Sequence, residues 1–138
     1  MGKALMNRTA EHWAHMAHDA RKAAQACTAG GHFRSAVSRA YYAMFAAVTG
    51  LLIDQKVMPR AGLGTWAHER LPGIAKENLK AKLGDVPSQD VKRMLTYMYK
   101  LRLIADYVPG ATVDGRDARD CLRYAMSVMR TLARDGNR

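Results

Sequence analysis

Apolar residues recur every three or four positions along most of the chain, the spacing that places them on one face of an α-helix. This pattern predicts a first helix that ends at Gly30, a second helix over about 32–54, a long helix that follows Pro87, and a last helix over 114–136. No segment shows the pattern of a β-strand convincingly, so the predicted fold class is all-α.

The predicted helix over 32–54 is apolar or small nearly all round, which is typical of a helix that packs on several sides. The connection after it is rich in glycine and proline and predicts two short helices, around 65–71 and 74–83. We therefore expect one domain over residues 1–138: an up-and-down bundle of four main helices, with additional short helices between the second and the fourth.

Arg39 lies near the start of the predicted central helix, on a face that also carries the small residues Ala36 and Ala43. A guanidinium that packs among apolar residues needs an anionic partner. Asp106 stands beside the apolar stripe of the helix that follows Pro87, so a contact between the two helices predicts a structural ion pair between Arg39 and Asp106. The alternative is that Arg39 faces solvent.

The charge balance is strongly basic, with 22 Lys plus Arg against 12 Asp plus Glu and a formal net charge of +10. A small domain of this charge is attracted to polyanions, with nucleic acid the first candidate and an acidic protein the second. No apolar run reaches the roughly 20 residues of a membrane span, and the N-terminus lacks the pattern of a secretory signal. We expect a cytoplasmic protein with no membrane partner.

The last predicted helix carries an arginine stripe nearly opposite its apolar face, suited to follow a phosphate backbone. The candidate RNA-binding residues are Arg116, Arg119, Arg123, Arg130 and Arg134. The alternative interpretation is that the stripe is an ordinary solvated helix face, because exposed faces are normally charged.

Motifs for metals and cofactors are absent from the sequence. His12, His15 and His18 share one side of the first helix without a third strong ligand nearby, so we expect solvent-facing histidines and no metal site. There is also no glycine-rich phosphate loop after a strand, no zinc-protease motif and no nucleophile elbow, and no cofactor is predicted.

Three segments, HFRSAVSRAYYAMFAAVTGLL, PRAGLGTWAHERL and YKLRLIADYVPG, with a closing amphipathic helix, resemble the HEPN family (higher eukaryotes and prokaryotes nucleotide-binding domain). The resemblance is to its small stand-alone bacterial branch and covers essentially residues 9–135. It implies a helical bundle that is often a homodimer. It also implies a partner resembling a nucleotidyltransferase, which would act as the antitoxin in a toxin–antitoxin or related defence module.

Many HEPN proteins are metal-independent ribonucleases whose signature is an arginine followed, after four to six residues, by a histidine. Histidine can exchange the proton of a ribose 2′-hydroxyl, and the arginine can neutralise the scissile phosphate. Here Arg102 matches the arginine, but Tyr107 takes the place of the histidine, and a tyrosine is a poor general base near neutral pH. His68 is the one histidine that we nominate as a displaced base.

The resemblance therefore favours an RNA- or nucleotide-associated protein that binds or regulates rather than cleaves. One alternative is a metal-independent endoribonuclease toxin with an altered motif, using Arg102, Tyr107 and His68. Another is a non-catalytic adaptor for an acidic partner protein.

Overall fold

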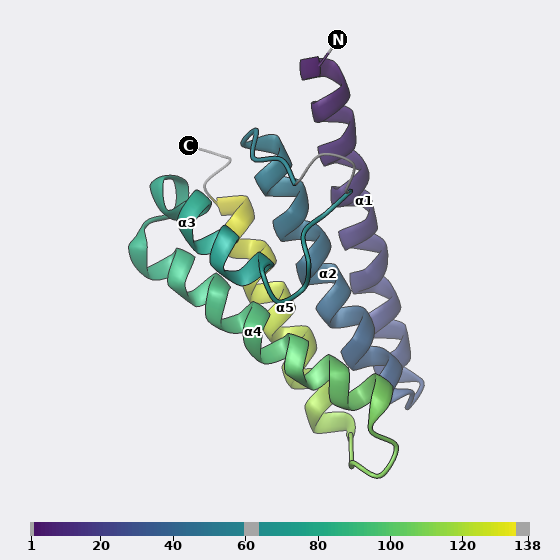
Figure 1. Ribbon diagram of the computed structural model, residues 1–138. Coiled ribbons are helices and arrows are strands. Elements are labelled where there is room, and N and C mark those ends of the chain that lie inside the picture. Colours follow the sequence, from purple (N-terminus) through teal and green to yellow (C-terminus); the bar gives the residue numbers. More distant parts are fainter. Residues whose placement is uncertain (1, 60–63, 135–138) are drawn as a thin grey trace.

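The computed structural model describes residues 2–59 and 64–134, with side chains over 9–59 and 64–133, and its regular elements there are all helices. They are α1 (Gly2–Ala29), α2 (Phe33–Asp54), α3 (Leu71–Leu83), α4 (Asp85–Tyr107) and α5 (Gly115–Arg134). The prediction of an all-α helical bundle is confirmed. Figure 1 shows α1 and α2 side by side and antiparallel, with α3 and α4 on the other side of α2 and α5 behind them.

The central helix of the bundle is α2, as its all-round apolar pattern predicts, because it contacts each of the other four helices. Tyr41, Met44, Val48 and Leu52 are fully buried along it. Gly50 lets α1 approach closely, since a Cβ atom at this position would lie 3.1 Å from the Cβ of Trp13.

In length and composition α2 also resembles a membrane-spanning helix. However, 78% of its most apolar stretch is buried inside the bundle. The central helix of a water-soluble bundle gives the same pattern, so this similarity is weak support for a membrane span.

The connection between α2 and α3 differs from its prediction. The expected short helix around 65–71 does not form: residues 64–70 make bends and turns, and in Figure 1 this segment runs back along α2. Trp66 and His68 turn toward the apolar core, a packing that overrides local helical preference. The second short helix does form, but it begins three residues earlier than expected, at Leu71, because a proline is tolerated in a first helical turn.

The turn between α3 and α4 is a single residue, Gly84, with a φ of +96° that favours glycine. As a result α4 begins at Asp85 rather than after Pro87, and Pro87 occupies its first turn. The hydroxyl of Ser88 lies inside the helix and donates to the carbonyl oxygen of Asp85. The register of α4 keeps Val91, Leu95 and Met98 in the core and turns Arg102 toward α2.

Candidate functional site

The candidate site lies at the C-terminal end of α4 and is built around Arg102. The Arg102 side chain is only 12% exposed, and its Nε lies 2.9 Å from Oδ2 of Asp106, one helical turn further on. Its Nη2 donates a 2.9 Å hydrogen bond to the hydroxyl of Tyr42 on α2. The guanidinium carbon also lies 5.2 Å from the ring centroid of Tyr42 and 5.6 Å from that of Tyr107. We call these four residues the arginine corner.

Asp106 links the arginine corner to α2. Its Oδ2 accepts a 3.1 Å hydrogen bond from the hydroxyl of Ser38, in addition to its contact with Arg102. The Nε–H of Arg102 makes no hydrogen bond to any described residue despite the short distance, so its contact with Asp106 is an ion pair without hydrogen-bond geometry. An anionic ligand that reaches this guanidinium must therefore compete with a carboxylate already in place.

The predicted ion pair between Arg39 and Asp106 is wrong. Arg39 is exposed, and its guanidinium lies over the ring of Tyr42, 5.2 Å from the centroid. The preceding residue, Ser38, is the one that faces Asp106, so the prediction misses the register of α2 by one position, about 100° around the helix. Asp106 pairs with Arg102 because residues one turn apart on a helix meet without any helix crossing.

A different arginine of α2, Arg34, anchors the end of α4, and the sequence analysis missed it. Its guanidinium donates to the backbone carbonyl oxygens of Ile104, Ala105, Val108, Pro109 and Ala111. The last carbonyls of a helix have no partner within that helix, and a cation near them also interacts favourably with the helix dipole. The signal that could have found Arg34 is the Pro109-Gly110 stop, which leaves those carbonyls in need of a donor.

His68 reaches the neighbourhood of the arginine corner. Its Nδ1 lies 2.7 Å from the hydroxyl of Tyr41, and its ring stacks on Tyr99 with centroids 5.3 Å apart and planes 7° apart. Its ring centroid is 6.1 Å from that of Tyr42, whose hydroxyl accepts from Arg102. Tyr42, which sequence reasoning assigned no role, thus links the two nominated residues.

The protonation of His68 follows from this setting. Burial lowers the pKa of His68 below its usual value of 6.5, and the positive charge of Arg102 lowers it further, against a smaller opposite effect of Glu69. Burial also raises the pKa of the Tyr41 hydroxyl, which therefore keeps its proton. When that hydroxyl donates to Nδ1, the proton of the neutral imidazole lies on Nε2.

The lowered pKa of His68 predicts a stability loss in acid. Below about pH 6.5 the unfolded chain binds a proton at this position more readily than the folded chain, so the free energy of unfolding falls as the pH falls toward the folded-state pKa. In the variant His68→Gln we expect the free energy of unfolding to fall less over the same pH range. Chemical denaturation of both proteins at about pH 7.5 and about pH 5 measures it. An equal loss in the two proteins would contradict the lowered pKa.

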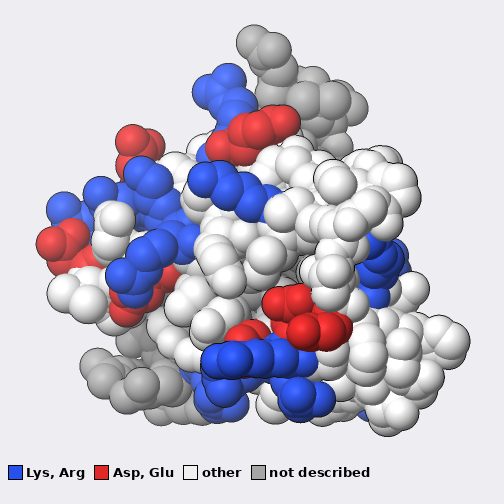
Figure 2. All heavy atoms as spheres, turned by 90° about the horizontal axis from the view of Figure 1, so that it is seen from below, with Lys and Arg blue, Asp and Glu red and all other residues white. Residues whose placement is uncertain are grey.

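The arginine stripe of α5 is exposed where its side chains are described. Arg116, Arg119, Arg123 and Arg130 face solvent, while the side chain of Arg134 lies outside the described residues. Arg123 forms an ion pair of 2.9 Å with Asp120. On the face of the molecule seen in Figure 2, basic side chains form several separate groups with carboxylates among them.

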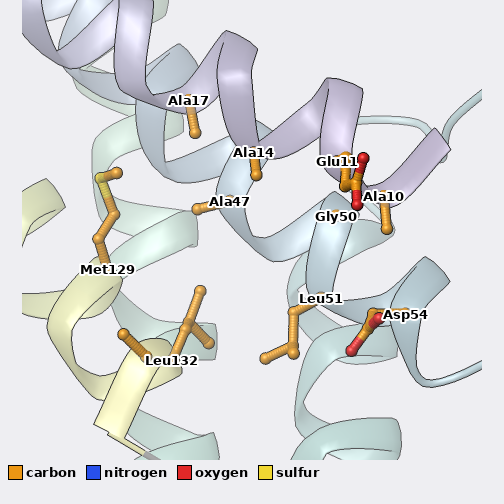
Figure 3. A pocket seen from close by; sticks show the side chains of 11 residues that line it. Ala10, Glu11, Ala14, Ala17, Ala47, Gly50, Leu51, Asp54, Met129 and Leu132 are labelled. Atoms are coloured by element: carbon orange, nitrogen blue, oxygen red, sulfur yellow. The ribbon is translucent and has the colours of Figure 1, made fainter. Parts of the chain in front are cut away.

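A cavity of about 520 Å³ opens between α1, α2 and α5 (Figure 3). Small apolar side chains such as Ala14, Ala17 and Ala47 line it, and Glu11 and Asp54 contribute carboxylates. Among the described residues that line it there is no histidine, lysine or arginine, so these residues offer no positive charge to a phosphate ligand.

The protein is therefore a small all-helical bundle with an arginine corner at the end of a long helix. The model of the HEPN domain family matches residues 10–135, nearly the whole chain. The chain belongs to the HEPN domain family, which associates it with nucleotides or RNA. No curated protein sequence matches this chain.

Proposed function

We propose that this HEPN protein binds RNA or a nucleotide as a component of a bacterial toxin–antitoxin or defence module, without cleaving RNA. The proposed setting is cytoplasmic, with a homodimer and a partner resembling a nucleotidyltransferase. One observation supports binding without cleavage. Arg102, which matches the arginine of the family's ribonuclease signature, is already paired with a carboxylate and a tyrosine hydroxyl.

The chemistry of cleavage supports this choice. A metal-independent ribonuclease needs a base for the 2′-hydroxyl and a cation whose charge is available to the phosphate. In the arginine corner the charge of Arg102 is balanced by Asp106, and the aromatic residue in the histidine position, Tyr107, is 67% exposed. An exposed tyrosine suits stacking on a base better than proton transfer.

An endoribonuclease remains the second candidate because of one observation on His68. This histidine has a lowered pKa, and its ring lies beside Tyr42, which carries the hydroxyl that Arg102 contacts. A neutral imidazole can accept a proton near neutral pH. In that case His68 and Arg102, which both lie beside Tyr42, would act together.

The proposed surface for RNA is the exposed part of the α5 arginine stripe. In a variant with Arg116, Arg119 and Arg123 replaced by glutamine, we expect weaker RNA binding and a smaller slope of log Kd against log salt concentration. Each lost phosphate contact removes a slope of roughly 0.7 to 0.9, so three contacts remove about 2 to 3. Fluorescence anisotropy with a labelled single-stranded RNA at several salt concentrations measures the slope.

The matched control removes the same charge elsewhere, with Lys22, Lys76 and Lys100 replaced by glutamine. This control should change the slope by less than about 1, because these lysines lie on α1, α3 and α4 rather than on one continuous stripe. An unchanged slope in the α5 variant rejects the stripe as the binding face. No RNA affinity at low salt in the unaltered protein would favour the adaptor for an acidic protein instead.

A further inference from the structure

A second cavity, of about 630 Å³, lies between α1, α2 and the 64–70 segment, apart from the α5 stripe. Four rings line it: Trp13 from α1, Tyr42 and Phe45 from α2, and His68 from the 64–70 segment. They form a continuous aromatic wall, with centroids 6.3 Å apart for Trp13 and Phe45 and 4.7 Å apart for Phe45 and His68. This volume and lining are typical of sites for small molecules.

Arg39 supplies the positive charge of the cavity. It is exposed, lines the cavity, and forms no ion pair with a carboxylate among the described residues. Its guanidinium rests on the ring of Tyr42, 5.2 Å from the centroid, which keeps it beside the aromatic wall. Asp19 also lines the cavity and carries the opposite charge, so a ligand with one anionic group fits better than one with several.

Two polar groups in the cavity lack a full set of partners. Oγ1 of Thr65, a residue that lines the cavity, is buried and makes no hydrogen bond within the described part of the chain. The ring of His68 lines the cavity and uses Nδ1 for Tyr41, which leaves Nε2 without a partner among the described residues. Hydrogen-bonding groups are therefore present at the aromatic wall as well as at Arg39.

We propose that this cavity binds a small planar aromatic molecule that carries one anionic group. The ring of the ligand packs against Trp13, Phe45 and His68, and its anionic group pairs with Arg39. This site goes beyond the proposed RNA binding, because it uses neither the α5 stripe nor the guanidinium of Arg102.

Isothermal titration calorimetry of the full chain tests the site with two probes, 1-naphthoate and adenosine 5′-monophosphate. Each probe has a control that lacks one feature: cyclohexanecarboxylate lacks the aromatic ring, and adenosine lacks the anionic group. We expect saturable 1:1 binding of at least one probe, and binding of its control that is weaker by about tenfold or more. The indole N–H signal of Trp13 in a nitrogen–proton NMR spectrum should shift on binding.

The variant Arg39→Gln should raise the Kd of the bound probe by about tenfold, because it removes the charged partner and leaves the aromatic wall. Arg39 is exposed, so this variant should keep its fold, which circular dichroism checks. The matched variant Arg93→Gln, at an exposed arginine of α4 that does not line the cavity, should leave the Kd unchanged.

Binding of naphthoate alone identifies a free aromatic acid as the ligand class, and binding of the nucleotide identifies a nucleotide. The proposal is overturned if neither probe binds, if Arg39→Gln binds as tightly as the unaltered protein, or if the Trp13 signal does not move. These outcomes are independent of RNA affinity, so this site and the proposed RNA binding can fail separately. Binding of the nucleotide would support the nucleotide part of the proposed function.

Discussion

Replacing Arg34 by alanine is expected to lower the free energy of unfolding by about 2–3 kcal/mol, the upper range for hydrogen bonds made by a charged group. The guanidinium of Arg34 donates to carbonyl oxygens over Ile104–Ala111, and its loss leaves the end of α4 without these donors. Urea denaturation followed by circular dichroism measures the change.

Two further variants test whether the loss of stability is specific to the guanidinium of Arg34. Arg34→Lys should recover only part of the loss, because a lysine cannot match the several donors of a planar guanidinium. Arg39→Ala, five residues along the same helix, should cost less than about 0.5 kcal/mol, as is usual for an exposed residue. A larger cost for Arg39→Ala than for Arg34→Ala would contradict the packing of α2 against α4.

Replacing Asp106 by alanine is expected to cost about 2–3 kcal/mol, below the range of a fully buried ion pair because Asp106 is 26% exposed. The variant leaves Arg102, which is 12% exposed, without its carboxylate partner. It also removes the acceptor of the Ser38 hydroxyl. Urea denaturation of the single variant gives this cost directly.

A double-mutant cycle separates the pair from the rest of the site. The variant with both Arg102→Met and Asp106→Ala should cost less than the sum of the two single variants, because neither charge then remains unpaired. The exposed pair of Arg93 and Asp90 is the control, and Asp90→Ala should cost less than about 0.5 kcal/mol. Additive costs at Arg102 and Asp106 would show that the two side chains do not interact.

The helices were largely predictable from the sequence, because their apolar spacing and their glycine and proline stops are local signals. The central position of α2 was predictable too, since a helix that is apolar all round has to pack on several sides. The contacts of the arginines on α2 were not predictable from the sequence. Arg34 and Arg39 look alike in the sequence, and only the crossing of α2 with the end of α4 decides which of them is anchored.

The candidate site was predictable only in part, for the same reason. The resemblance to HEPN proteins placed Arg102 and Tyr107 at the end of α4, and both lie in the arginine corner. The connection of His68 to this corner runs through Tyr42, a contact between segments far apart in the chain. The non-helical course of 64–70 depends on the packing of Trp66 and His68, which no local pattern reveals.

Arg102 in the arginine corner is already paired with Asp106, and on this ground we propose RNA binding without cleavage. Incubation of the purified protein with end-labelled RNA in the absence of metal, followed by denaturing electrophoresis, tests it most directly. We expect RNA retained by the protein at low salt to be recovered at full length. Fragments that appear with the unaltered protein and disappear with Arg102→Ala would instead establish a ribonuclease that depends on Arg102.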